Sequence, residues 1–362
     1  MEQHVLVAGA TGLVGRAAME HFARKGVRTT AVSRRRPWDT YGAAWISADL
    51  ADQAAVAAAL GGLTDVTQVV FAALHEEPEL VAGWLEDRHV RRNGEMLHNL
   101  LEVVDRVSPA LQNVVILQGP KAYGVHVGLM RPGAREDRDE RHEVPNFYWA
   151  QENHLKAKQR GRPWSWTVIR PALVVGMAVG GAMNLVAALG VYGALLRRRG
   201  EPLHYPGGAG ALLEATDTDL MARAFEWAGS SLAAANQTFN VTNGELFSLK
   251  DLWPDIARAL GMEVGDDIPL GFADELPRAA AEWNAIRAEH GLIAPAMDAF
   301  IGQSFQFADF VLARTLRTAP QSAAMSSIKI RRAGFNDTLY SDEMFAKWFA
   351  RYQAERLLPP VA

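Results

Sequence analysis

The chain has 362 residues, 49% of them apolar, and a formal net charge of −4. This length allows roughly two to three domains, or one large domain with an elaborated edge, around a sizeable core. The slightly acidic charge gives no attraction to nucleic acid or to an anionic membrane. The chain contains no cysteine, which excludes disulfides, thiolate catalysis and thiolate metal sites.

The first informative stretch is HVLVAGATGLVG, from His4 to Gly15. The apolar run Val5–Ala8 predicts one buried strand, and helical spacing over Arg16–Lys25 predicts a helix after the glycines. A strand, a glycine turn and a helix in this order are the context that makes a dinucleotide-binding motif credible. We therefore expect the beginning of the chain to bind a dinucleotide.

Each glycine of this turn has its own physical role. Gly9 lets the chain leave the strand in a tight turn, Gly12 lets backbone N–H groups approach a pyrophosphate, and Gly15 lets the helix pack closely on the strand. The helix N-terminus presents unpaired N–H groups and the positive end of its dipole to the phosphates. The residues expected to contact the cofactor here are Gly9, Thr11, Gly12, Leu13, Val14 and Gly15.

The second expected strand, residues 28–33, ends where the ribose of the cofactor must lie. An NAD site commonly has Asp or Glu at this point, whereas an NADP site has Arg near the 2′-phosphate. This chain has Ser33 followed by three arginines, with no acid before Asp39. Guanidinium groups bind phosphate through forked hydrogen bonds. We therefore expect NADPH as the cofactor, with contacts from Ser33, Arg34 and Arg35.

Three further strands are expected at residues 44–48, 66–74 and 113–117, with helices at 51–60 and 88–107. The carboxyl ends of such strands lie beside a bound dinucleotide. The contacts expected from them are Asp49, Leu50, Ala72, Ala73 and Gln118. Asp49 could accept a hydrogen bond from the adenine amino group or could cap the helix after it, and the sequence leaves both open.

Two charged segments are expected to be solvated loops. One is the acidic segment Glu76–Glu79, which follows the fourth strand, and the other is the run Arg135–Glu143. Neither has the apolar periodicity of a packed element, so we assign them to the surface.

Residues 171–196 carry no charge and precede three arginines, as a membrane span with a cytoplasmic flank would. However, the segment begins with Pro171, contains five glycines and has Asn184 in its middle. A strand at residues 166–170 leads into it. We therefore expect a buried strand, a glycine-rich loop and an apolar helix, and no membrane insertion.

Strands alternate with helices along this part of the chain, which is typical of a parallel sheet covered by helices. We predict an α/β fold, with a Rossmann-like doubly wound parallel sheet and a smaller, mainly helical C-terminal substrate lobe. The expected nucleotide-binding domain is residues 1–171 plus about 212–243. The expected lobe is about residues 172–211 and 244–362.

Short-chain reductases on such sheets usually carry a tyrosine with a lysine one helical turn later. The ammonium then binds the ribose and lowers the tyrosine pKa. This chain departs from that rule, because Glu152 follows Tyr148 at this spacing and Val127 follows Tyr123. Neither tyrosine has the lysine on its own helix.

This departure matches a known pattern. The chain has Asn146-Phe147-Tyr148 with Glu152, and Lys121-Ala122-Tyr123 after a strand. Further matches are Ser33-Arg34-Arg35, Ile169-Arg170-Pro171, FNVTNG at 239–244 and Gly334-Phe335. In these motifs, which extend over nearly the whole chain, the sequence resembles the progesterone 5β-reductase and iridoid synthase family of atypical extended short-chain dehydrogenases/reductases.

The resemblance implies reduction of the C=C bond of an apolar enone or enal with NADPH. In this family the lysine comes from the loop after the fifth strand, which here is Lys121. The resemblance implies that Tyr148 holds the enolate oxygen by hydrogen bonding, an oxyanion-hole function, while Lys121 favours the developing anion. The cofactor site it implies also includes Lys121, Tyr148, Pro171, Ala172, Leu173 and Val174.

Two departures leave the substrate open. Steroid-reducing members usually have Lys-His-Tyr where this chain has Lys121-Ala122-Tyr123, and their following Gly-Pro-Phe is replaced by Gly124-Val125-His126. Two alternatives to an ene-reductase also stay open. One is an NADP(H)-dependent carbonyl reductase or epimerase of the extended type, and the other is a non-catalytic NADP-binding redox sensor.

The remaining expectations concern partners and location. No histidine spacing indicates a metal site, and we expect neither nucleic acid nor a membrane as a partner. The absence of a visible secretory signal and of cysteine predicts a cytoplasmic location. The amphipathic segment 340–358 could serve a homodimer or pack on its own core.

Overall fold

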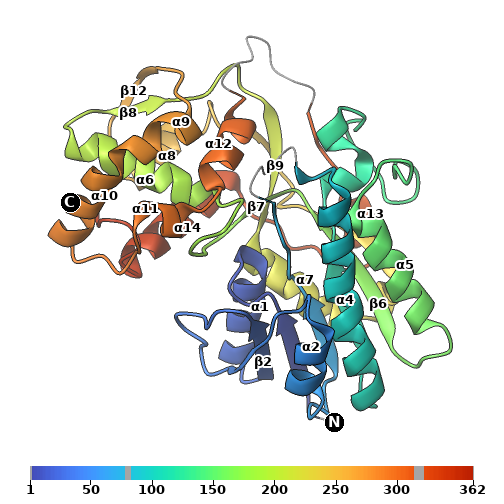
Figure 1. The fold of residues 1–362 in the computed structure, drawn as a ribbon. Coiled ribbons are helices and arrows are strands. Elements are labelled where there is room, and N and C mark those ends of the chain that lie inside the picture. Colours follow the sequence, from blue (N-terminus) through green and yellow to red (C-terminus); the bar gives the residue numbers. More distant parts are fainter. Residues whose placement is uncertain (1, 78–82, 314–321, 362) are drawn as a thin grey trace. The chain divides into compact units, whose positions relative to one another are not determined.

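The computed structural model describes residues 2–77, 83–313 and 322–361 (Figure 1). The chain divides into two compact units. The first unit consists of Met1–Ala172, Thr218–Thr242 and Met325–Asp337. The second unit consists of Leu173–Asp217, Asn243–Ala324 and Thr338–Ala362.

A seven-stranded parallel sheet forms the centre of the first unit, with the strand order β10-β6-β5-β4-β1-β2-β3. The strands are β1 (His4–Ala8), β2 (Arg28–Ser33), β3 (Ala44–Ser47), β4 (Gln68–Phe71), β5 (Asn113–Leu117), β6 (Ser165–Pro171) and β10 (Gln237–Val241). The order runs outward from β1 in both directions, which is the doubly wound topology. The predicted fold class is confirmed, and each predicted strand forms, although the fourth is shorter than expected.

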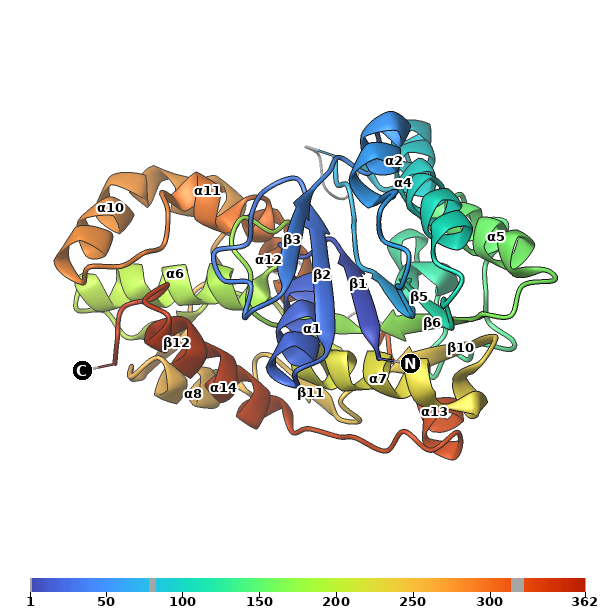
Figure 2. The same ribbon diagram turned by 90° about the horizontal axis from the view of Figure 1, so that it is seen from below.

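Helices cover both faces of this sheet (Figure 2). One face carries α2 (Gln53–Leu60), α4 (Asp87–Val107) and α5 (Phe147–Gln159), and the other carries α1 (Leu13–Arg24), α7 (Thr218–Ser230) and α13 (Ile328–Arg332). Strands covered on both sides must be apolar throughout, and β1 is buried at all five positions. Helix α4 packs its fully buried Leu97, Leu100 and Leu101 in one core with Val69 and Val114 of the strands.

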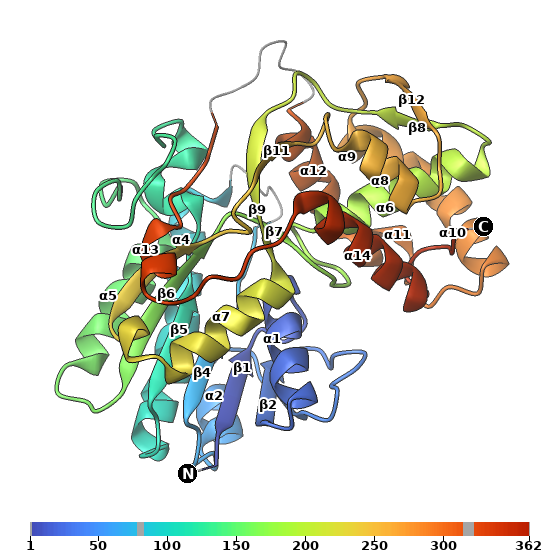
Figure 3. The same cartoon turned by 180° about the vertical axis from the view of Figure 1, so that it is seen from behind.

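The second unit is mainly helical. Its helices are α6 (Leu185–Arg198), α8 (Trp253–Ala259), α9 (Phe272–Glu275), α10 (Ala280–Glu289), α11 (Met297–Ile301), α12 (Ser304–Leu312) and α14 (Ser341–Ala354). A three-stranded sheet in the order β11-β9-β7 is formed by Leu246–Ser248, Leu212–Asp217 and Leu173–Val175. A two-stranded sheet pairs β12 (Val264–Asp267) with β8 (Leu203–Tyr205). Helix α14 packs against α6 and α8 (Figure 3).

The uncharged stretch after Pro171 forms the core of this second unit. It begins with β7, continues through a glycine-rich loop and ends in α6, whose residues from Leu185 to Leu196 are all buried. A Cβ on Gly193 would lie 2.8 Å from Leu260 Cδ1, so a larger residue here would displace the Leu260 side chain. Within the described ranges, no helix combines the length and apolarity needed to cross a bilayer. The predicted strand, loop and buried helix are confirmed.

The observed unit boundaries differ from the predicted ones at two places. Met325–Asp337 lies in the first unit, although its position in the chain predicted the C-terminal lobe. Its Lys329 Nζ donates to the Thr238 carbonyl of β10 at 2.9 Å, and this long-range contact has no local signature in the sequence. Conversely, Leu212–Asp217 lies in the second unit, because it pairs as β9 with β7 and β11.

The charged run Arg135–Glu143 is not a purely solvated loop, so that prediction is wrong in part. Glu136 is 8% exposed and accepts a hydrogen bond from the Asn240 backbone N–H at 2.7 Å. Glu140 forms an ion pair of 2.7 Å with Arg170. Glu136 is buried and Glu140 is half-buried, because the residues that pair with them lie on β10 and β6, far away in sequence.

Candidate active site

The glycine turn packs directly on the end of β4. Gly9 has a φ of +84°, and a Cβ there would lie 2.7 Å from the backbone carbon and oxygen of Ala72. A Cβ on Gly15 would overlap the Gly9 carbonyl oxygen. Both positions therefore require glycine, for the turn conformation at Gly9 and for the close helix packing at Gly15.

The N-terminus of α1 is open to an anion. Its N-cap residue, Gly12, provides no side-chain cap, and the first turn contains no acidic residue. Since the first N–H groups of a helix have no acceptor within it, those of Leu13, Val14 and Gly15 are available to a ligand. A Cβ on Gly12 would meet the Gly9 carbonyl oxygen at 3.5 Å, an ordinary contact distance, so the fold itself does not require glycine at this position. These features fit a pyrophosphate.

At the end of β2, Ser33 shapes the loop that carries the arginines. Its side chain is buried, and its Oγ donates to the Arg35 carbonyl at 2.7 Å. Arg34 and Arg35 are exposed, and neither forms an ion pair with another described residue. Two guanidinium groups without an ion-pair partner among the described residues therefore follow β2, and their contact with a 2′-phosphate stays a prediction.

The two alternatives for Asp49 are partly resolved. Asp52, not Asp49, is the N-cap of α2, because its Oδ1 accepts from the Ala55 N–H at 3.0 Å. Asp49 Oδ1 accepts from the Ala51 N–H at 3.0 Å in the turn before the helix. The capping alternative is therefore wrong, and the adenine contact stays a prediction.

Tyr148 lies in the first turn of α5. Its backbone N–H donates to the Asn146 side chain at 3.1 Å, so the Asn-Phe-Tyr motif contains the N-cap of its own helix. The Tyr148 side chain is 7% exposed, and its hydroxyl has no hydrogen-bond partner among the described residues. A Cβ on Gly119 would lie 3.2 Å from this hydroxyl. Burial raises the pKa of Tyr148, with a further increase from the Glu76 charge, so the phenol remains a neutral donor.

Lys121 comes from the short 3₁₀ turn Pro120–Tyr123 that follows β5. The next residue, Ala122, packs in one cluster with Phe147, Tyr148 and Trp149, which holds this turn against the beginning of α5. The Lys121 ammonium lies 4.1 Å from the centre of the Trp84 ring. Burial lowers the pKa of Lys121 to about 8, and the neighbouring Glu76 opposes that decrease.

Glu76 is a site residue that the sequence analysis missed. The segment Glu76–Glu79 was predicted to be solvated, but the Glu76 and Glu77 side chains are only 7% and 4% exposed. Glu79 lies outside the described residues. Asn93 of α4 fixes the loop, because its Oδ1 accepts from the His75 N–H at 2.8 Å and its Nδ2 donates to the His75 carbonyl at 2.9 Å. The sequence did contain one signal for Glu76. An acidic residue stands close after a predicted parallel strand, and ligands bind at the carboxyl ends of such strands.

Glu76 is surrounded by groups that influence its charge. Its Oε2 lies 3.9 Å from Nε2 of His89, which is 1% exposed. Burial raises the pKa of Glu76 to about 7, while Lys121 opposes that increase. Burial and the Lys121 charge lower the pKa of His89 to about 4, and burial is also the main reason that the pKa of His126 is about 4. Both imidazoles are therefore neutral near pH 7, and Glu76 faces Lys121 as the acidic partner.

A buried network connects β6 with the two candidate catalytic segments. Arg170 is fully buried and donates from Nε to Gln118 Oε1 at 2.7 Å and from Nη1 to the Tyr123 hydroxyl at 3.1 Å. Gln118 Nε2 in turn donates to Glu152 Oε2 at 2.7 Å. The Tyr123 hydroxyl donates to Asn240 Oδ1 at 2.6 Å, which gives Tyr123 a structural role.

The other predicted cofactor residues fall in both units. Ala72 and Ala73 line the glycine turn, and Pro171 ends β6. Leu173 and Val174 begin β7 of the second unit, so their contact with a cofactor stays a prediction. The side chain of Gln118 is engaged by Arg170 and Glu152.

A doubly wound sheet, a glycine turn on an uncapped helix, and a tyrosine and a lysine on adjoining segments are features of an oxidoreductase of the short-chain dehydrogenase/reductase class. The model of one family in this class, the PRISE-like Rossmann-fold domain, matches residues 47–359. The chain therefore belongs to the PRISE-like Rossmann-fold family, which confirms the resemblance to progesterone 5β-reductases and iridoid synthases.

Characterised relatives match almost the whole chain. An (S)-8-oxocitronellyl enol synthase of Nepeta racemosa is 29% identical, with 98% of this chain and 91% of the relative covered. A 3-oxo-Δ(4,5)-steroid 5β-reductase of Arabidopsis thaliana is 27% identical, with 99% of this chain and 94% of the relative covered.

Solved structures confirm the fold. UDP-glucose 4-epimerase of Thermotoga maritima, solved with UDP-glucose, has a TM-score of 0.69 at 15% identity and covers 97% of this chain and 99% of its own. A short-chain dehydrogenase/reductase superfamily protein of Agrobacterium tumefaciens, solved with NAD, has a TM-score of 0.63 at 16% identity, covering 98% of both chains. At these identities the likeness extends to the fold alone.

The raised pKa of Glu76 makes stability depend on pH in a defined direction. Its folded pKa of about 7 lies above the ordinary value of 4.5, so the folded state binds more protons between these values. The stabilisation is complete below about pH 4.5 and is lost as pH rises through 7. In Glu76→Gln this dependence is absent, so wild type should lose about 3 kcal/mol relative to the variant from pH 4.5 to pH 8. Urea unfolding across this pH range measures the difference.

The control for this experiment is Glu95→Gln, since Glu95 is an exposed carboxylate on the same unit. That variant should follow wild type at every pH. Parallel curves for wild type and Glu76→Gln would contradict the raised pKa of Glu76.

Proposed function

We propose that this protein uses NADPH to reduce the C=C bond of an α,β-unsaturated ketone or aldehyde. The observation that carries the proposal is the free Tyr148 hydroxyl at the beginning of α5, together with Lys121 on the adjoining turn, in a chain of this family. The names of the relatives support the same reaction class, because one is a 3-oxo-Δ(4,5)-steroid 5β-reductase and others are 8-oxocitronellyl enol synthases.

NADPH would be held by the glycine turn and by the arginines that follow β2. The α1 N-terminus offers unpaired N–H groups to the pyrophosphate, and the guanidinium groups of Arg34 and Arg35 suit a 2′-phosphate. When bound, this cofactor supplies the hydride that is added to the β-carbon of the substrate.

Tyr148 would stabilise the charge that develops on the substrate carbonyl oxygen. A phenol whose pKa is raised by burial stays protonated at neutral pH and can donate a hydrogen bond to an enolate oxygen. A preorganised donor of this kind accounts for a large part of transition-state stabilisation in such reactions. The Tyr148 hydroxyl has no competing partner among the described residues, so no existing hydrogen bond must break before it donates.

Lys121 would add positive charge near the same oxygen. Its pKa of about 8 keeps the ammonium mainly charged at pH 7, although burial favours the neutral form. The Glu76 carboxylate acts against this burial effect and therefore helps Lys121 to keep its proton. We assign Glu76 the role of a positioning residue that acts through Lys121.

The reaction class is tested by measuring NADPH oxidation with 2-cyclohexen-1-one and with a linear enal, followed by product analysis. We expect the saturated ketone or aldehyde, since hydride addition to the β-carbon leaves the carbonyl group in place. An allylic alcohol would assign the protein to carbonyl reduction instead. NADPH binding without oxidation of the nucleotide by any enone would favour the redox sensor.

Replacement of Tyr148 by Phe should lower kcat by on the order of 10²–10³-fold, because one oxyanion donor is lost. NADPH affinity, measured by fluorescence titration, should change little, since the substitution removes only the hydroxyl. The control is Tyr340→Phe, in which the tyrosine replaced is 65% exposed. Unchanged kcat in Tyr148→Phe would remove this residue from the mechanism.

Replacement of Arg34 and Arg35 together by Ala should weaken NADPH binding far more than NADH binding, because only NADPH carries the 2′-phosphate. Dissociation constants for both nucleotides give the comparison. A matched double variant, Arg131→Ala with Arg160→Ala, removes two exposed arginines elsewhere and should alter neither constant. An equal loss for both nucleotides in the first variant would refute the 2′-phosphate assignment.

A further inference from the structure

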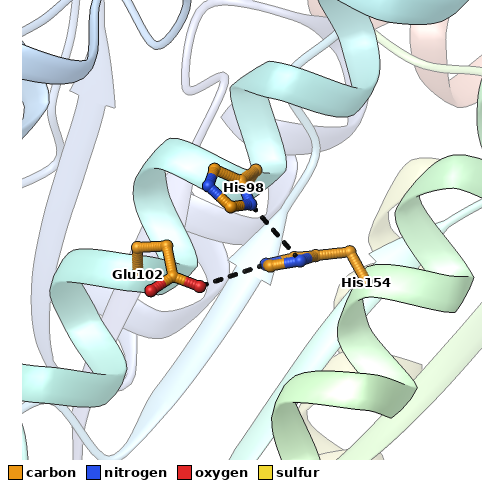
Figure 4. Close-up of side chains that lie close together, drawn as sticks. All are labelled: His98, Glu102 and His154. Atoms are coloured by element: carbon orange, nitrogen blue, oxygen red, sulfur yellow. Dashed lines mark hydrogen bonds and ion pairs between the residues drawn. The ribbon is translucent and has the colours of Figure 1, made fainter.

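Two histidines and a glutamate converge between α4 and α5 (Figure 4). His98 and Glu102 lie one helical turn apart on α4, so their side chains share one face of the helix. His154 extends toward them from α5. One potential ligand atom from each of the three side chains lies within 4.8 Å of the other two.

The spacing of the two imidazoles is that of a metal site. The His98 and His154 Nδ1 atoms are 3.3 Å apart. Two nitrogens bound tetrahedrally to Zn²⁺ at about 2.0 Å must lie about 3.3 Å from each other. Without a metal, two Nδ1 atoms at this distance must form a hydrogen bond, in which one ring donates its N–H and the other accepts it.

The third candidate ligand is the Glu102 carboxylate, which lies on the same face of α4 as His98. His154 Nε2 is buried and has no hydrogen-bond partner among the described residues. Since one imidazole offers a single nitrogen to a given ion, the Glu102 carboxylate, whose Oε1 lies 3.8 Å from His154 Nε2, must turn toward the two Nδ1 atoms to share their ion. The Glu102 and His154 side chains are 35% and 21% exposed, so water can reach the site and fill the remaining positions.

We propose that His98, His154 and Glu102 form a binding site for a divalent transition-metal ion, with Zn²⁺ as the ion that fits their geometry. Imidazole nitrogen favours Zn²⁺ and its neighbours over Mg²⁺ and Ca²⁺, which prefer all-oxygen sites. Two nitrogens and one carboxylate oxygen leave a fourth position for water. The ion would connect α4 to α5, two helices that pack against each other.

Lys158 is a built-in competitor for this site. Its Nζ lies 2.7 Å from Glu102 Oε2, so the ammonium holds the carboxylate that the ion needs. Lys158 also lies 3.5 Å from Asp105 Oδ2, which offers it an alternative partner when Glu102 turns toward a metal. Removal of the ammonium should therefore tighten metal binding, which distinguishes a coordinated ion from non-specific attraction to acidic residues.

The test uses the full-length protein after treatment with a chelator and dialysis, with ZnCl₂ titrated by calorimetry. We expect one equivalent to bind to wild type, with affinity at least tenfold lower in His98→Gln and in His154→Gln. Lys158→Gln should bind more tightly than wild type. His290→Gln, which replaces an exposed histidine outside the cluster, should bind as wild type does.

Cobalt provides a second measurement that does not depend on heat of binding. Tetrahedral Co²⁺ with nitrogen and oxygen ligands gives intense visible absorption, and no thiolate band can interfere because the chain has no cysteine. We expect the absorption in wild type and in His290→Gln, and its loss in His98→Gln. Zinc binding that persists unchanged in His98→Gln and His154→Gln, or no stoichiometric binding in wild type, would overturn the proposal.

Discussion

The arrangement of the two candidate catalytic segments depends on one buried guanidinium. Arg170 is fully buried at the end of β6, and a buried charge is tolerated only when it is paired and hydrogen-bonded. Its partners lie on separate parts of the first unit, namely Gln118 after β5, Tyr123 in the turn that carries Lys121, and Glu140 in the charged run. The guanidinium therefore fixes the turn of Lys121, while Gln118 extends the network to Glu152 on the helix of Tyr148.

This network includes the position where a helical lysine would stand. The acid one turn after Tyr148, Glu152, is 3% exposed and accepts a hydrogen bond from Gln118, while Lys156 of the same helix pairs with its other oxygen. A lysine in place of Glu152 would put a second cation beside the buried Arg170 and leave Glu140 as the one carboxylate that pairs with Arg170 among the described residues. In the proposed mechanism the cation that assists Tyr148 therefore comes from another element, the turn after β5 that carries Lys121.

Burial and charge oppose each other at the site. Burial raises the pKa of Glu76 to about 7 and lowers that of Lys121 to about 8, so both groups are pushed toward their neutral forms. Their mutual attraction works in the other direction and favours the charged pair. As a result, Glu76 and Lys121 titrate close to neutral pH, whereas the Tyr148 phenol stays protonated there. The fold itself does not determine this chemistry, because epimerases with the same fold match the chain at low identity.

The sequence by itself determined the features that arise from local patterns. Backbone sterics explain why glycine stands at positions 9 and 15. Short apolar runs predicted the strands, and an uncharged stretch interrupted by glycine predicted α6. The motif Asn146-Phe147-Tyr148 was also recognised in the sequence, and in the structure Asn146 is the N-cap of α5, which begins at Phe147.

The tertiary structure alone decided which charged groups are buried. Glu76 and Glu136 lie in segments that look solvated, and each is buried because groups distant in the chain surround it, His89 for the first and Asn240 for the second. Contacts between residues distant in the chain also place Met325–Asp337 in the first unit. Such contacts bring His98 of α4 to His154 of α5 as well. Local periodicity predicts which face of an element is apolar, but the desolvation and pairing of a charge depend on contacts that form only when the chain folds.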